Sequence, residues 1–152
     1  MSYSPVFADN RQARFNYEIL ETYEAGIELV GTEVKSIRRG QANLRDSYAI
    51  VRNGEIFLLN MYIAPHATTS AVFNHEPTRT RRLLLHKQEI RKLIGKVEQK
   101  GLTLVPLKLY LSKGWIKVSI GLARSKKLHD KRETIQKRDA TREIARAMKG
   151  ER

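Results

Sequence analysis

The dipeptide Asn53-Gly54 lies between two short apolar runs, 48–51 and 56–59, and it restricts the fold more than any other local feature. Both residues tolerate the positive φ angles that a two-residue type I′ turn requires. The segment 47–63 therefore predicts a β-hairpin.

Other segments alternate in the same way and predict further strands. Residues 17–23 alternate, residues 24–26 have the composition of a turn, and residues 27–29 resume the pattern, which predicts a second hairpin. Two longer strands are predicted over 102–111 and 115–122. The apolar phase reverses at Val105-Pro106, and because proline cannot donate to a ladder, a bulge or a barrel corner is expected there.

Two segments carry helix patterns. A short helix over 33–39, with Thr32 as its N-cap, is expected to end at Gly40. Apolar residues at i, i+3, i+4 and i+7 from Ile90 predict a longer helix over 86–100 that ends at Gly101. The segment 64–80, which follows the predicted hairpin 47–63, is expected to form a long loop, and such loops are often functional.

About six strands with two or three helices predict a mainly β fold with flanking helices. The architecture that fits the composition best is a small antiparallel β-barrel of the oligonucleotide-binding type. A chain of 152 residues has the size of one domain. We expect a flexible lead-in over 1–14, in which Asp9 or Asn10 is placed to cap a short helix, then the barrel over 15–123, and a basic tail over 124–152.

The charge of the chain points to an anionic partner. The net charge is +13 with a pI near 10.2, and the tail alone has eleven lysines and arginines against five acidic residues. The apolar residues of the tail form one narrow helical stripe, and an isolated helix of that kind is marginal in water. We therefore expect the tail to be disordered when free and to fold on a large anionic partner. The alternative is a solvated charged tail without a role.

Several function classes lack their signatures. The chain has no cysteine, no phosphate-binding glycine loop and no nucleophile elbow, and its four histidines lack the spacing of metal ligands. His66 and His75 are expected at the surface. We expect no enzyme, no cofactor and no metal. No segment approaches the ~20 apolar residues of a membrane span. The expected state is a cytoplasmic monomer without membrane contact.

Nucleic acid is the favoured partner class. Basic residues recur at 38–39, 79–82, 87–100 and 113–117, and the barrel order would bring these clusters near one another. RNA is favoured over DNA because no segment has the pattern of a major-groove recognition helix.

Several long strings of the sequence resemble the bacterial SsrA-binding protein family (small protein B): GTEVKS at 31–36, RTRRLLLHK at 79–87, KGLTLVPL at 100–107 and KKLHDKR at 126–132. The resemblance extends from about residue 10 to residue 149. It implies an RNA-binding adaptor that binds the tRNA-like domain of transfer-messenger RNA and delivers it to stalled ribosomes for trans-translation. The alternative is a general single-stranded RNA-binding barrel.

The resemblance also implies roles for individual residues. The positions that match RNA contacts of the body are Glu24, Leu84 and Lys117, and the further candidates are Arg38, Asn43, Arg82, Lys126 and Lys127. The positions that match the small-subunit decoding centre and message channel of the ribosome are His129, Asp130, Lys131, Arg132, Met148 and Lys149. Two positions depart from the family pattern: Phe15 stands where relatives often have His, and Ala147 stands where some have Ile.

Overall fold

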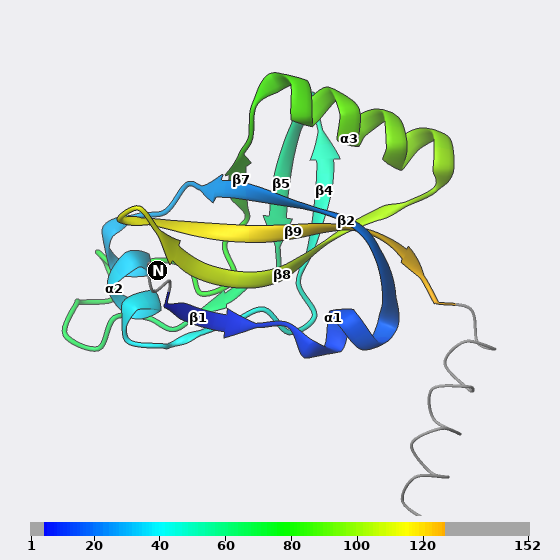
Figure 1. The fold of residues 1–152 in the computed structure, drawn as a ribbon. Coiled ribbons are helices and arrows are strands. Elements are labelled where there is room, and N and C mark those ends of the chain that lie inside the picture. Colours follow the sequence, from blue (N-terminus) through cyan, green and yellow to red (C-terminus); the bar gives the residue numbers. More distant parts are fainter. Residues whose placement is uncertain (1–4, 127–152) are drawn as a thin grey trace, which may run out of the picture.

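Antiparallel strands and three helices make up residues 5–126, the part of the chain that this computed structural model describes (Figure 1). The elements within it are β1 (Val6–Asp9), α1 (Arg11–Asn16), β2 (Tyr17–Ile27), α2 (Gly31–Arg38), β3 (Ala42–Asn43), β4 (Tyr48–Arg52), β5 (Glu55–Leu59), β6 (Tyr62–Ile63), β7 (Arg81–Leu84), α3 (Lys87–Lys100), β8 (Thr103–Ser112) and β9 (Trp115–Ser125).

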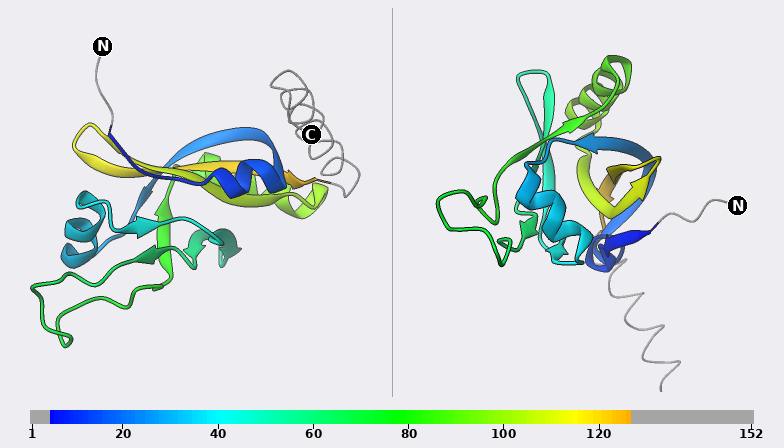
Figure 2. Two further views of the ribbon diagram at one scale, coloured as in Figure 1. Left: turned by 90° about the horizontal axis from the view of Figure 1, so that it is seen from below. Right: turned by 90° about the vertical axis from the view of Figure 1, so that its left-hand side faces the viewer.

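Six of the strands form a near-closed ring. The main sheet has the order β1-β8-β4-β5-β7-β2-β9, and β9 also pairs with β8, so that β8, β4, β5, β7, β2 and β9 follow one another around the ring. Every pairing is antiparallel, β1 is added on β8, and β3 pairs with β6 in a separate small sheet. The helices α2 and α3 lie well apart on the outside (Figures 1 and 2). The mainly β, antiparallel prediction is confirmed.

The core fills the ring because apolar side chains alternate inward along its strands. Ile56 and Leu58 on β5, and Val118 and Ile120 on β9, are at most 1% exposed. Helix α3 adds Leu93, which is fully buried. This burial of apolar area is the main stabilising contribution to the fold.

One tight turn, one bulge and one helix end agree with the sequence. Asn53 and Gly54 both have positive φ, at 53° and 74°, and connect β4 to β5 in the predicted hairpin. The register of β8 on β9 shifts between Pro106 and Lys108, which confirms the predicted irregularity. Helix α3 ends at Gly101 in the left-handed conformation, as predicted.

The hairpin predicted over residues 17–29 is wrong. Residues Tyr17–Ile27 form one continuous strand that pairs with β9 as far as Gly26, which lies opposite Lys117. Gly26 does not form a turn. It allows β2 and β7 to approach closely, because Leu84 of β7 packs directly on it.

The predicted short helix exists, but its cap is different. Helix α2 starts at Gly31, so Thr32 is a helical residue and Val30 is the N-cap. The side chain of Glu33 reaches back to accept from the backbone N–H of Val30 at 2.9 Å, which satisfies one of the unpaired N–H groups at the helix start.

The expected surface position of two histidines is also wrong. His66 and His75, both in the loop 64–80, are only 7% and 9% exposed. Burial requires partners for the ring nitrogens. His75 has them in the hydroxyl of Thr32 and the carbonyl of Ile63, both at 2.9 Å, and Nδ1 of His66 lies 2.9 Å from the hydroxyl of Thr69.

The segment expected as a lead-in contains two elements. Strand β1 pairs with β8, and α1 follows it with Asn10 as the N-cap, whose side chain accepts from the N–H of Ala13 at 3.2 Å. This is the cap that the sequence placed at Asp9 or Asn10. Over residues 5–126 the structure contains no helix long and apolar enough to cross a membrane.

Candidate nucleic-acid interface

Glu24, Leu84 and Lys117 come together around Gly26. This glycine lies opposite Lys117 on β9 and opposite Leu84 on β7, and Glu24 precedes it by two residues on β2. Because side chains alternate along a strand, all three point away from the core, and Leu84 is 45% exposed. Three residues that are far apart in the sequence thus share one patch of the outer surface, here called the Gly26 patch.

Leu84 depends on the absence of a side chain at residue 26. A Cβ atom placed on Gly26 would lie 3.2 Å from the Cβ of Leu84, which is tighter than ordinary van der Waals contact. The glycine therefore sets the position of Leu84, the apolar member of the patch.

Tyr110 fixes the carboxylate of Glu24. Its hydroxyl donates to Oε2 of Glu24 at 2.7 Å, and Tyr110 lies opposite Lys117 in the β8–β9 ladder. Burial, and then the hydrogen bond to Glu24, raise the pKa of Tyr110, so the hydroxyl keeps its proton at neutral pH. Within residues 5–126 the other oxygen of Glu24 accepts no hydrogen bond, and it is available to donors of a ribose or a base.

Arg82 lies on the same outer face of β7 as Leu84, but its charge is already compensated. It donates to Glu28 at 2.6 Å and to Glu55 at 2.9 Å. The hydrogen bonds to these carboxylates raise the pKa of Arg82. Arg82 therefore adds little net positive charge to this face.

Arg38 belongs to a basic pocket on α2. Lys35, Arg38, Arg39 and His66 line a hollow of about 420 Å³. The three cations form no ion pair or side-chain hydrogen bond with any residue that the structure describes. Burial, and then the charges of Arg39 and Lys35, lower the pKa of His66, so its ring is neutral at pH 7. This pocket therefore concentrates uncompensated positive charge on α2.

Asn43 and Lys126 lie apart from the Gly26 patch. Oδ1 of Asn43 accepts from the N–H of Arg45 at 2.8 Å, which uses the side chain in a local turn. Lys126 follows β9 at the end of the ladder opposite to Lys117, and its ammonium lies 5.9 Å from the ring of Phe15, at the margin of a cation–π contact. Lys127 and the predicted tail residues His129, Asp130, Lys131, Arg132, Met148 and Lys149 lie outside the described residues.

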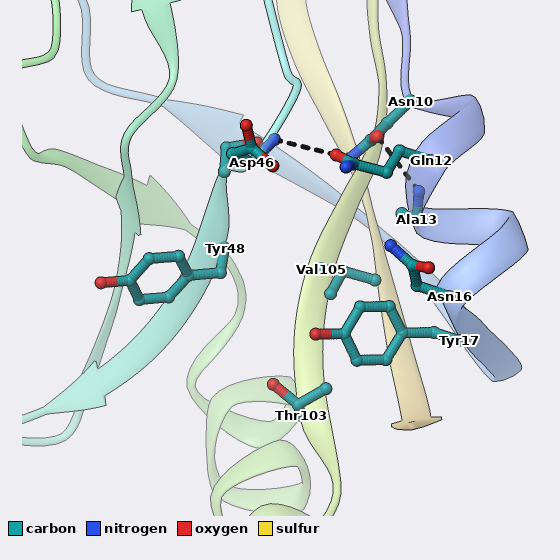
Figure 3. A pocket seen from close by; sticks show the side chains of 10 residues that line it. Asn10, Gln12, Ala13, Asn16, Tyr17, Asp46, Tyr48, Thr103 and Val105 are labelled. Carbon is teal, nitrogen blue, oxygen red and sulfur yellow. Dashed lines mark hydrogen bonds between the residues drawn. The ribbon is translucent and has the colours of Figure 1, made fainter. Parts of the chain in front are cut away.

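A polar cavity of about 340 Å³ lies between α1 and strands β4 and β8 (Figure 3). Figure 3 shows the rings of Tyr17 and Tyr48 at this cavity, with amide side chains from α1 above them. The amide of Asn10 donates to the carbonyl of Pro106 at 2.9 Å, which ties α1 to β8. Among the described residues, none of the predicted RNA-contact positions lines this cavity.

Sequence reasoning missed Gly26 and Tyr110. Gly26 was assigned to a predicted turn, but it has no positive φ and lies inside a continuous strand. The position of Tyr110 could have been predicted from the sequence, because a two-residue turn at Lys113-Gly114 fixes the strand register and places Tyr110 opposite Lys117.

A near-closed antiparallel ring with an outward polar and apolar patch and unpaired cations is typical of small β proteins that bind nucleic acids. Comparison with known proteins is more specific: the chain belongs to the SmpB protein family, which matches residues 7–150.

Close relatives cover nearly the whole chain. An SsrA-binding protein of Acaryochloris marina is 68% identical over 144 residues, which cover 95% of this chain and 94% of the relative. An SsrA-binding protein of Synechococcus elongatus is 67% identical with the same coverage. A solved structure described as "tmRNA-SmpB: a journey to the center of the bacterial ribosome" is similar with a TM-score of 0.65 and 59% identity, over 79% of this chain and 84% of that chain.

Proposed function

We propose that this protein binds transfer-messenger RNA and brings it to stalled ribosomes for trans-translation. The observation that carries the proposal is membership of the SmpB family, with SsrA-binding relatives that are 67% to 68% identical over 95% of the chain. The protein acts as an RNA-binding adaptor of the cytoplasm and not as an enzyme.

The body binds the tRNA-like domain of the RNA through the Gly26 patch. The ring of strands is a β-barrel of the oligonucleotide-binding type. Leu84 supplies an apolar contact, Lys117 a phosphate contact, and the free oxygen of Glu24 an acceptor for ribose or base donors. What supports this assignment is the grouping of the three side chains on one outward face. A structured RNA is then read mainly by shape, and phosphate contacts make the affinity fall with salt.

Further residues extend this interface. Arg38 and Lys126 add phosphate contacts on either side of the body, with Asn43, Arg82 and Lys127 as additional candidates. The tail over 124–152 performs a separate task, with His129, Asp130, Lys131 and Arg132 at the decoding centre and Met148 and Lys149 in the message channel. The family match through residue 150 and the basic composition of the tail support this division. The protein acts as a monomer.

Truncation tests the division of tasks. Removal of residues 128–152 is expected to leave binding of the tRNA-like domain unchanged and to abolish peptide tagging in reconstituted translation of a message without a stop codon. Lys117→Ala, with the tail intact, is the matched variant and is expected to weaken RNA binding first. Equal loss of RNA binding in both variants would contradict two separable tasks.

The alternative, a general single-stranded RNA binder, differs in its selectivity. Competition between the tRNA-like domain and oligo-uridine at about 0.15 M ionic strength separates the two functions. Preference for the tRNA-like domain supports the adaptor, and equal affinity supports the general binder.

A further inference from the structure

A small apolar pocket lies between α2 and the turn that joins β8 to β9. Its volume is about 240 Å³, and its walls come from Ile27 at the end of β2, Leu29 after it, Val34 of α2 and Ile116 of β9. Arg38, Gly114 and Trp115 complete the lining. Trp115 lies two residues before Lys117 on β9, and Lys117 belongs to the Gly26 patch, so the pocket adjoins this patch.

Trp115 presents its indole to solvent at this pocket. It is 72% exposed, although tryptophan is usually well covered in folded proteins, and its ring N–H has no partner among residues 5–126. The backbone beneath it is held in place, because Lys113 and Gly114 have positive φ and Ser112 pairs with Trp115. A Cβ placed on Gly114 would have no neighbour within 4 Å, so this side of the pocket is open.

Two unpaired cations accompany the indole. Arg38 lines the pocket, and Lys117 lies two residues from Trp115 on the same face of β9, at about 7 Å along the strand. No ion pair compensates either charge in the part of the chain described, and no carboxylate lines the pocket. The site therefore selects against cationic ligands and favours an anionic one.

An exposed aromatic plane, an apolar wall and adjacent cations are the groups that bind an unstacked nucleotide. An apolar side chain of a protein partner would fit the wall but would leave both cations unused. We propose that this pocket binds one unstacked nucleobase of the bound RNA, stacked on Trp115, with its phosphates contacted by Arg38 and Lys117. The inference rests on the proposed RNA-binding function and deepens it by naming a base-binding subsite.

The chain offers a direct probe, because Trp115 is its single tryptophan. Titration of the full-length protein with a transcript of the tRNA-like domain is expected to quench the tryptophan emission in step with binding. Trp115→Ala is expected to weaken binding about 5- to 150-fold, the range for loss of one base–aromatic stack. Trp115→Phe keeps an aromatic plane and is expected to restore most of the affinity.

Two further variants test the chemistry of the contact. Trp115→Leu keeps apolar bulk without an aromatic face and is expected to bind like Trp115→Ala. Arg38→Ala is expected to weaken binding and to reduce the slope of log affinity against log salt by about one contact. Phe73→Ala removes another aromatic side chain, 79% exposed on the loop 64–80, and serves as the matched control with unchanged affinity.

The outcomes separate this inference from the function on which it rests. If the transcript binds tightly without quenching the tryptophan emission, or binds wild type and Trp115→Ala with equal affinity, Trp115 does not stack on a base. The RNA-binding function would then still stand. Equal binding by the Leu and Phe variants overturns stacking in favour of a plain apolar contact. Quenching by oligo-uridine without preference for the tRNA-like transcript supports the pocket and overturns the proposed partner.

Discussion

Nε of Arg81 donates to Oε2 of Glu33 across 2.5 Å, and both side chains are fully buried. Glu33 also accepts from Arg79 at 2.7 Å, and Arg81 donates to the carbonyl of Met61 at 2.8 Å. This network ties α2, which carries Arg38, to β7, which carries Leu84. It therefore fixes the basic pocket relative to the Gly26 patch.

Glu33→Gln is expected to destabilise the fold strongly, because it leaves the buried guanidinium of Arg81 without its counter-charge. Removal of one partner of a buried pair typically costs about 3–5 kcal/mol. Unfolding in urea measures the loss. Glu55→Gln is the matched control, since it breaks a half-exposed pair with Arg82 and is expected to cost less than about 1 kcal/mol. Similar losses in both variants would contradict the structural role of the buried pair.

The contribution of Glu33 is expected to depend on pH. Burial alone would raise its pKa, but hydrogen bonds from Arg79 and Val30 and the charge of Arg81 outweigh burial and hold the pKa below its ordinary value of 4.5. A carboxyl whose pKa is lowered by folding stabilises the protein fully above the unfolded-state pKa, and the contribution disappears as pH falls through the folded-state pKa. The stability difference between wild type and Glu33→Gln should therefore narrow below about pH 4.5. A difference that stays constant down to about pH 3 would argue against this ionisation.

Gly26→Ala is expected to weaken RNA binding while the protein stays folded. The new Cβ would lie 3.2 Å from Leu84 and would displace that side chain by a few tenths of an ångström. We expect a loss of affinity of about 1 kcal/mol, or about five-fold. Electrophoretic mobility shift with the tRNA-like domain measures it.

Gly95→Ala is the matched control for this substitution. It lies on α3 with nothing within 4 Å of the added Cβ, so RNA affinity should not change and stability should rise by about 0.5–1 kcal/mol. Full affinity in Gly26→Ala would show that the position of Leu84 is unimportant for binding.

Tyr110→Phe tests whether the fixed orientation of Glu24 contributes to RNA binding. Loss of the hydroxyl frees the carboxylate, and we expect a loss of affinity of about 0.5–1.5 kcal/mol. In a double-mutant cycle with Glu24→Gln the two losses should not add, because they remove one shared contact.

Tyr23→Phe is the matched control, since it breaks a similar hydrogen bond to Glu21 on the opposite side of β2. It should leave RNA affinity unchanged. Additive losses in the cycle, or equal losses from both tyrosine variants, would contradict a positioning role for Tyr110.

Much of the scaffold was predictable because its signals are local. Each of three signals determines the structure of only the few residues around it. They are the positive φ angles of Asn53 and Gly54, the i, i+3, i+4 spacing of apolar residues from Ile90, and the missing N–H of Pro106. The hairpin, helix α3 and the bulge follow from them. The charge balance and the quoted sequence strings likewise indicated an RNA partner and the family, because both properties are independent of folding.

The site itself depended on tertiary structure. The sequence placed a turn at residues 24–26, and only the pairing of β2 with both β7 and β9 shows that Gly26 brings Leu84 and Lys117 together. The burial of His75 and of Arg81 could likewise not be predicted from the sequence, because both are polar and these hydrogen-bond partners lie more than ten positions away. The physical reason is that strand register and the pairing of buried polar groups are decided by long-range contacts, which become favourable only when the ring closes.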